Sequence, residues 1–212
     1  TIPANGSSIT AVASLGFATT DGTYNSLVQL DADTYVNAWW ASSNNGKVGT
    51  YTIPADGSSI TEVTTLLHDG SYTYGYNSLI AIDANTVLLT YSGESEDGYL
   101  KTFAIPADGS TITEKIVLEH DVYLGYYNSV VQVDFDTYAL AYYGGPQSYG
   151  VIKTFDYSLT AATMNPRISS VVIAADNSTI AVTMNEAVYN ATGGSGALAV
   201  SDFALTLSGG AA

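Results

Sequence analysis

A unit of about 51 residues occurs three times in this sequence, and such a period is typical of repeat architectures. Each copy carries an Ile-Pro-Ala-Asn/Asp-Gly-Ser turn, whose prolines lie 51 and 52 residues apart at positions Pro3, Pro54 and Pro106. Each copy continues to a Tyr-Asn-Ser block before an apolar run, beginning at Tyr24, Tyr76 and Tyr127. We place the repeats at residues 1–51, 52–103 and 104–157, within a repeat region of residues 1–163.

Each repeat divides into four short strand-like runs separated by turn signals. Around the first Tyr-Asn-Ser block these runs are residues 26–30, 34–40, 47–53 and 59–67, and Asp-Gly or Asn-Gly next to Pro is a strong turn signal. Charged residues make up only 12% of the chain, while 17 tyrosines accompany many Thr, Val and Ile residues, which favours strands. Four antiparallel strands in about 50 residues is the size of one β-propeller blade, so we predict an all-β fold of propeller type.

The first run of each repeat supports this choice over a β-trefoil, which also has three repeats of four strands. A trefoil strand in a barrel wall would alternate apolar and polar residues. The run is instead nearly all apolar, which predicts burial on both faces between stacked blades. Its apolar residues are Leu27, Val28 and Leu30, then Leu79, Ile80 and Ile82, then Val130, Val131 and Val133. The trefoil is kept as the alternative.

Three repeats are fewer than the blades of a closed propeller. Propellers close with about 4–8 blades, whereas the sequence holds three repeats and begins inside one of them. We therefore expect a piece of a longer protein, a ring completed by several chains, or an open stack. The third repeat has no clear fourth run after residues 151–157, and residues 1–2 and 8–15 are the candidates to pair there.

The pattern changes near Pro166, so we expect a second segment over residues 166–212. Residues 184–189 and 196–203 resemble the Ig-like modules that recur in bacterial and archaeal surface and secreted proteins. An Ig-type sandwich takes about 100 residues, so this resemblance implies only a partial Ig-like β-sandwich.

The repeats themselves resemble blade repeats of large extracellular β-propeller proteins of environmental microbes. The resemblance rests on Tyr-Asn-Ser at 127–129, Thr-Tyr-x-x-x-Tyr at 137–142 and Gly-x-x-Lys-Thr-Phe at 150–155. The first copy departs from it, with Trp39 at the second Tyr position and Gly49 at the Lys position. The resemblance implies an extracellular location, secreted or at the cell surface, rather than an activity.

The net charge of −15 bears on the partners. A surface this acidic repels phosphate groups, and we therefore expect neither nucleic acid nor an anionic membrane as a partner. Glycans and Ca²⁺ remain open as partners. The sequence has no apolar run of about 18 residues, so we expect no membrane insertion. It has no cysteine, which excludes disulfides, thiolate metal sites and a cysteine nucleophile.

Two histidines, His68 and His120, stand at equivalent places beside acidic residues, and Phe17 takes that place in the first copy. A position that accepts Phe indicates packing rather than acid–base catalysis. A glycoside-processing site would need carboxylates that converge, for which Asp69, Glu119 and Asp121 are the candidates. We predict that the chain is not an enzyme.

Acidic pairs recur at the first turn of each repeat and are weak candidates for Ca²⁺, namely Asp31, Asp33, Asp83, Asp134 and Asp136. The alternative is that these side chains bond to their own turn. No complete calcium loop is present, so we commit to no metal and no other cofactor. Asn-x-Ser/Thr sequons, which are glycosylation candidates, begin at Asn5, Asn177 and Asn190.

Aromatic residues are the candidates for ligand binding, because a sugar ring packs on an aromatic face. The candidate rings are Trp39, Trp40, Tyr91 and Tyr142, together with the clusters at residues 74–76 and 123–127. For the rings at equivalent strand positions, Trp39, Tyr91 and Tyr142, packing between blades is the favoured role. The amides of Asn25, Asn77 and Asn128 line one end of the repeats or tie neighbouring loops together.

Three functional hypotheses follow from these features. The first is a non-enzymatic extracellular structural or adhesive module, in a surface layer or filament completed by strands from other copies of the chain or from other domains of a longer one. The second is a glycan-binding propeller, and the third is a glycoside-processing enzyme.

Overall fold

The computed structural model describes residues 10–18, 21–43, 45–70, 74–134, 136–157, 168–174, 179–184, 189–191 and 195–197. The chain divides into two compact units, Thr1–Tyr157 and Ser158–Ala212. The described residues are all-β, with antiparallel strands and one short 3₁₀ turn at Glu94–Glu96. Within these ranges, no helix has the length and hydropathy that crossing a membrane requires.

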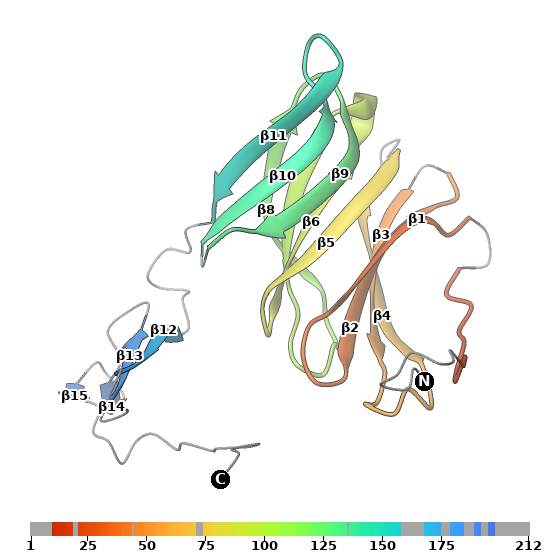
Figure 1. Cartoon of the computed structure of the whole chain (residues 1–212). Coiled ribbons are helices and arrows are strands. Elements are labelled where there is room, and N and C mark those ends of the chain that lie inside the picture. The colour runs from red at the N-terminus through yellow and green to blue at the C-terminus, as the bar shows by residue number, and fades with distance from the viewer. Residues whose placement is uncertain are drawn as a thin grey trace. The chain divides into compact units, whose positions relative to one another are not determined.

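Three antiparallel sheets make up the first unit, and each follows the chain order of its strands. The first sheet consists of β1 (Thr23–Gln29), β2 (Thr34–Ala41), β3 (Asn45–Thr52) and β4 (Thr61–Asp69). The second consists of β5 (Gly75–Asp83), β6 (Thr86–Ser92), β7 (Gly98–Ala104) and β8 (Thr113–Asp121). The third consists of β9 (Gly125–Gln132), β10 (Thr137–Gly144) and β11 (Tyr149–Asp156). The sheets pack face to face, and their first strands β1, β5 and β9 lie side by side (Figure 1).

Each sheet has a forward face, which turns toward the next sheet along the chain, and a rear face, which turns toward the previous one. Side chains alternate between these faces along each strand. One apolar core joins the forward face of the first sheet, with Val36 and Val48, to the rear face of the second, with Leu89 and Phe103. The other core joins the forward face of the second sheet to the rear face of the third through Ile82, Leu88, Leu100, Val130, Tyr138, Leu140 and Tyr142.

The first strand of each sheet is buried on both faces only where a sheet lies on each side. In β1 the rear-facing Leu27 is 60% exposed, and beyond β9 the forward-facing Val133 is 61% exposed. Their equivalents in the second sheet, Leu79 and Ile82, are half-buried and buried. The prediction of burial on both faces is therefore wrong for the first and third sheets, because each has one face without a neighbouring sheet among the described residues.

The Pro-Ala-Asp-Gly turns form as predicted. Gly57 and Gly109 both have φ of +65°, a left-handed conformation that glycine adopts at little cost. The amide of Gly57 donates to the carbonyl of Pro54 over 2.7 Å, and that of Gly109 donates to Pro106 over 2.8 Å.

The N-terminal segment does not complete the third sheet of its own chain. Its described part, residues 10–18, forms no strand, and its Phe17 ring packs edge-on against Trp39 of β2 with 5.2 Å between ring centroids. The prediction that residues 8–15 pair beside β11 is wrong for this described part, and residues 1–9 lie outside the described ranges.

Among its described residues, the second unit contains two short pairs of antiparallel strands. Strand β12 (Ile168–Ile173) pairs with β13 (Ile180–Met184), and β14 (Tyr189–Ala191) pairs with β15 (Ser195–Ala197). The sequon residue Asn190 lies in β14. The other two sequon residues, Asn5 and Asn177, fall outside the described residues.

Candidate functional site

A row of three tyrosines crosses the three sheets at the start of their first strands. The rings of Tyr24 and Tyr76 lie 4.7 Å apart by their centroids, and those of Tyr76 and Tyr127 lie 4.6 Å apart. The two outer rings are accessible, with Tyr24 46% and Tyr127 66% exposed. We call these three residues the tyrosine row.

The backbone of the tyrosine row is unusual. The φ angles are +53° at Tyr24, +52° at Tyr76 and +55° at Tyr127, a left-handed conformation that bulky residues rarely adopt. The strand register shifts at this point in all three sheets, as a β-bulge does. Bulges re-aim side chains, and strained residues persist only where surrounding contacts hold them. The same local strain is thus kept at three equivalent positions.

The rest of the Tyr-Asn-Ser block supplies the contacts that hold the row. The amide Nδ2 of Asn77 donates to the carbonyl of Tyr24 over 3.0 Å, and Asn128 donates in the same way to Tyr76 over 3.2 Å. Each asparagine thereby fixes the tyrosine of the preceding sheet. The Asn25 amide has a local partner, the carbonyl of Gly22 at 2.7 Å.

The serines of the block add a second connection between sheets. The Ser26 hydroxyl accepts the backbone amide of Leu79 over 2.9 Å, and the Ser78 hydroxyl accepts that of Val130 over 3.2 Å. Of the two roles that the sequence left open for the asparagines, Asn77 and Asn128 realise the tie between loops. A ligand-binding role of Asn25, Asn77 and Asn128 stays a prediction.

Further aromatic rings widen the row. Tyr126 lies 4.9 Å from Tyr76 and 6.2 Å from the 40% exposed Tyr74. Burial, helped by hydrogen bonds with the hydroxyls of Tyr127 and Tyr24, raises the pKa of Tyr76. Its hydroxyl is therefore uncharged at neutral pH, and the surface offers apolar ring faces with neutral polar groups.

The strand aromatics that the sequence offered as binding candidates lie elsewhere. Trp39, Tyr91 and Tyr142 are only 2%, 1% and 4% exposed. Tyr91 and Tyr142 pack between sheets, and Trp39 packs against Phe17 behind the first sheet. They present no ring face to a ligand, so the prediction of sugar stacking on these three rings is wrong in this structure. Trp40 is half-buried on the opposite side of β2 from Trp39.

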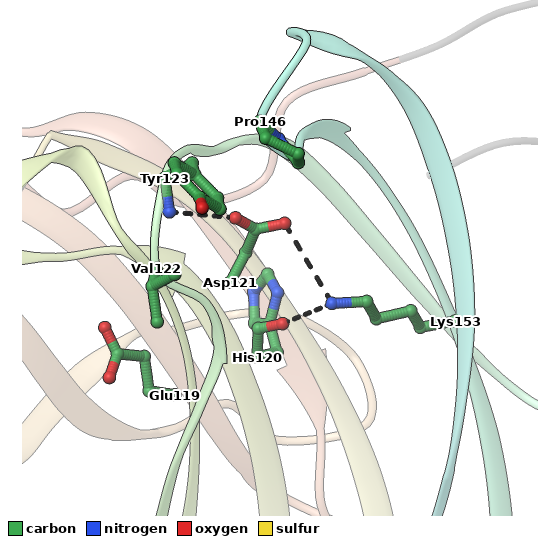
Figure 2. A pocket seen from close by; sticks show the side chains of 7 residues that line it. All are labelled: Glu119, His120, Asp121, Val122, Tyr123, Pro146 and Lys153. Carbon is green, nitrogen blue, oxygen red and sulfur yellow. Dashed lines mark hydrogen bonds and ion pairs between the residues drawn. The ribbon is translucent and has the colours of Figure 1, made fainter.

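A polar junction fastens the third sheet to the second beside a cavity of about 230 Å³ (Figure 2). The Asp121 carboxylate is its centre and accepts from the Tyr142 hydroxyl over 2.8 Å and from the backbone amides of Tyr123 and Gly145 over 2.9 and 3.0 Å. Lys153 donates to the carbonyl of His120, with its Nζ 3.9 Å from Asp121 (Figure 2). Groups of the protein thus occupy both oxygens of this carboxylate.

The second junction, between the first and second sheets, has the same parts. The Tyr91 hydroxyl donates to Asp69 over 2.9 Å, and Lys101 donates to the carbonyl of His68. The His68 ring packs edge-on against Tyr91 with 4.8 Å between centroids. Both histidines pack against neighbouring rings. This agrees with the interpretation, drawn from Phe17, that the position serves packing.

Burial, followed by the positive charge of the neighbouring lysine, lowers the pKa of both histidines, to about 3 for His68 and about 4 for His120. The negative charge of Asp121 partly offsets this effect at His120. Neither ring nitrogen of either histidine has a hydrogen-bond partner within the described residues. The two imidazoles are thus neutral near pH 7 and are part of the packing.

Apolar residues replace this whole set behind the first sheet. Phe17 and Ala18 stand where the junctions have His and Asp, while Trp39 and Gly49 stand where they have Tyr and Lys. A Cβ atom on Gly49 would lie 3.1 Å from the Trp39 ring, so the larger ring occupies the space that a side chain at position 49 would need. All four positions thus differ in the first repeat from their equivalents in the other two repeats.

The candidate carboxylates for glycoside chemistry are only partly brought together. Glu119 and Asp121 line the same cavity, whereas Asp69 is not among the residues that line it. Burial, with a hydrogen bond to Glu119, raises the pKa of Asp97 to about 6, so Glu119 is engaged with a second carboxyl group.

Three of the five candidate calcium ligands are engaged in their own turns. Asp31 Oδ1 accepts the backbone amides of Asp33 and Thr34 over 3.2 and 2.8 Å, and Asp83 Oδ1 accepts that of Asn85 over 2.8 Å. The Asp136 carboxylate accepts the hydroxyl of the adjacent Thr137. In the described part of the chain, no three His, Asp or Glu side chains gather to hold a metal ion.

Comparison with known proteins gave no family. No protein-family model and no curated protein matches the chain. Among solved structures, a mutant of NanB sialidase from Streptococcus pneumoniae is 13% identical at a TM-score of 0.41, over 58% of this chain and 20% of that one. An α-L-arabinofuranosidase from Lactobacillus brevis is 10% identical at a TM-score of 0.41, over 64% and 49%. An uncharacterized protein from Listeria monocytogenes is 12% identical at 0.37, over 71% and 40%.

The chain thus spans at most about half the length of these three proteins. The likeness is too distant to carry their activities over to this chain.

Sequence reasoning named the asparagines and two tyrosine clusters as candidates, but it missed the row and its left-handed backbone. The signal was present in the period itself. Equivalent residues of stacked repeats lie next to one another, so Tyr24, Tyr76 and Tyr127 were bound to form a row once the sheets stacked in order.

Proposed function

We propose that this chain is a non-enzymatic, extracellular adhesive module of β-propeller type, which binds neutral polysaccharide along its tyrosine row. The observation that carries this proposal is the conformation of the row. Three equivalent tyrosines keep a left-handed φ near +53°, and two of them are exposed at the ends of the row. Strain retained at equivalent sites is typical of functional positions.

The chemistry of the row favours a neutral sugar polymer. Sugar rings pack on aromatic faces, and their hydroxyls pair with neutral polar groups such as the tyrosine hydroxyls. The net charge of −15 opposes acidic polymers. A row of equivalent rings also suits a chain of equivalent sugars, because successive units can occupy successive rings.

The arrangement of the sheets supports the propeller type over the trefoil. The strands form three separate sheets packed face to face, with β1, β5 and β9 side by side, whereas a trefoil would place strands of all three repeats in one barrel wall. The hairpins β12–β13 and β14–β15 are compatible with part of an Ig-like sandwich, which we propose for the second unit. The extracellular location rests on the resemblance of the repeats and on the acidic surface.

Removing the outer rings of the row should abolish polysaccharide binding. We expect affinity electrophoresis in gels containing neutral polysaccharides to retard the natural chain, and the variant Tyr24→Ala with Tyr127→Ala to migrate freely. If each ring contributes about 2 kcal/mol, as binding hot spots do, each substitution weakens binding by about 30-fold. The matched control is Tyr149→Ala, because Tyr149 is 50% exposed but lies outside the row.

Retardation of the double variant equal to that of the natural chain would refute the role of the row. The proposal also fails if no neutral polysaccharide in a broad panel retards the natural chain. Circular dichroism of each variant checks that its sheets are intact.

A further inference from the structure

The first unit has two apolar faces that match each other. On the forward face of the third sheet, Val131, Val133 and Ile152 are 55%, 61% and 77% exposed. Their equivalents in the second sheet, Ile80, Ile82 and Leu100, belong to the core that covers the next sheet. The third sheet therefore carries the apolar side chains of a forward face with no described sheet against it.

The rear face of the first sheet is the counterpart. It forms an apolar groove of about 360 Å³, whose lining includes Leu15, Phe17, Leu27, Tyr51 and Ile53. The equivalents of Leu27, Tyr51 and Ile53 in the second sheet are Leu79, Phe103 and Ile105. All three belong to the core between the first and second sheets. The chain makes two contacts in which a forward face packs on a rear face. The forward face of the third sheet and the rear face of the first sheet have the residues for a third contact of this kind.

One strand is also lacking in the third sheet. In the first two sheets the third strand pairs with a fourth, β3 with β4 and β7 with β8. Strand β11 pairs only with β10 among the described residues. The sequence equivalent of β4 and β8 nearest the N-terminus is the segment of residues 10–18, since Thr10, Thr61 and Thr113 stand 51 and 52 residues apart.

This segment already lies where the fourth strand of a preceding sheet would lie. Phe17 contacts the rings of Trp39 and Tyr51 at 5.2 and 6.4 Å. His68 of β4 contacts the equivalent rings of the next sheet, those of Tyr91 and Phe103, at 4.8 and 6.0 Å. If the third sheet of another copy packed against the rear face of this first sheet, the free edge of its β11 would lie beside residues 10–18.

The composition of the segment fits burial between subunits. Residues 10–18 contain no charged side chain, whereas β4 and β8 carry acidic residues. Val12 and Leu15 of the segment are 51% and 38% exposed. Interface cores are depleted in charge, and an open strand edge such as β11 is a ready template for pairing.

We propose that residues 10–18 of a second copy of this chain pair with β11 and complete the third sheet, while the two apolar faces close on each other. The register follows from the second sheet, where Leu100 stands opposite Leu118. By equivalence, Ile152 of one copy stands opposite Leu15 of the other. Two copies joined at both ends hold six sheets, within the range of about 4–8 in closed propellers.

This assembly rests on the propeller-type arrangement of the proposed function but not on the tyrosine row, so loss of sugar binding would leave it standing. The test uses the absence of native cysteines. The variants Leu15→Cys and Ile152→Cys are co-expressed with different tags and oxidised in air, and the product is examined on a non-reducing gel. Directly opposite positions on paired strands have the separation that a disulfide needs.

We expect a disulfide-linked dimer that carries both tags, and a native mass of about twice 22.1 kDa for the unmodified chain by light scattering. Either single variant alone, and Val12→Cys with Ile152→Cys, should yield little cross-linked product, because those residues are not opposite each other in the proposed register. A mixed-tag dimer on the gel together with a native mass well above twice 22.1 kDa by light scattering would keep the strand pairing but replace the closed ring by an open filament.

A chain that stays monomeric by light scattering and gives no mixed-tag product would overturn the proposal. Equal cross-linking in the Val12→Cys control would overturn it as well, since random collision would then explain the disulfide. Binding to polysaccharide gels, measured on the same samples, reports separately on the tyrosine row.

Discussion

Acidification from about pH 7 to about pH 4.5 should lower the free energy of unfolding through the two buried histidines, by about 2 kcal/mol each. In the unfolded chain both imidazoles bind protons below about pH 6.5. In the folded chain their pKa values lie near 3 and 4, because burial and a neighbouring lysine oppose the charge. Between the unfolded pKa of about 6.5 and the folded pKa values, the unfolded state binds more protons than the folded state, so stability falls as the pH falls.

Two carboxyl groups modify this pH profile. The folded pKa of Asp97 is raised to about 6, so the folded state binds its proton first, and this group adds stability as the pH falls from about 6 to about 4. For Asp121, burial raises the pKa, but hydrogen bonds from the Tyr123 amide and the Tyr142 hydroxyl outweigh it and leave the pKa lowered. Its contribution is present above about pH 4 and is lost below that.

The variant with both His68→Phe and His120→Phe isolates the histidine contribution. Phenylalanine keeps a planar ring but carries no titratable group, and Phe17 occupies the equivalent position in the first repeat. We expect the variant to lose most of the decline between about pH 6.5 and pH 4.5, as measured by urea denaturation followed by circular dichroism at a series of pH values. Parallel profiles for the variant and the natural chain would show that the histidines are not buried as neutral groups.

The substitution Phe103→Ala should lower the free energy of unfolding by about 3–5 kcal/mol, the usual cost of removing a buried phenylalanine side chain. Phe103 is fully buried in the core between the first and second sheets, and its ring also contacts His68. Removing it leaves a cavity that two packed sheets fill only in part. The measurement is urea denaturation at neutral pH.

Phe155→Ala is the matched control for this prediction. Phe155 has the same place in the third repeat and contacts His120 at 6.3 Å, but it is only half-buried. We expect a loss that is clearly smaller than that of Phe103→Ala. Equal losses would mean that the second sheet covers Phe155 as fully as the first sheet covers Phe103, which would contradict the half-buried position of Phe155.

The period of the sequence predicted much of the fold because it is a local and repeated signal. The turns at Gly57 and Gly109, and the packing role of the histidine position, followed from residue types at equivalent places. The hydrogen-bond set of Asp121 could not be predicted, since Tyr142 belongs to another sheet and Gly145 to the turn that follows β10. The left-handed tyrosines were missed because propensity disfavours that conformation. The bonds that Tyr24 and Tyr76 accept from the next sheet do not show in a local pattern.

Exposure at the two ends of the stack was also beyond a local pattern. Leu27 and Leu79 have the same residue type and the same place in their repeats, yet one is exposed and the other half-buried. The difference lies in which sheet precedes them, and no property of the residue itself encodes it.

The coordinated change of Phe17, Ala18, Trp39 and Gly49 limits how far these repeats can be exchanged. A lysine grafted alone at position 49 would meet the Trp39 ring, since even a Cβ atom there lies 3.1 Å from it. Residues that share one packed space have non-additive effects. Permuted or consensus versions of this chain would therefore have to transfer the four positions as a set, which makes the boundary between sheets, rather than the repeat, the unit of exchange.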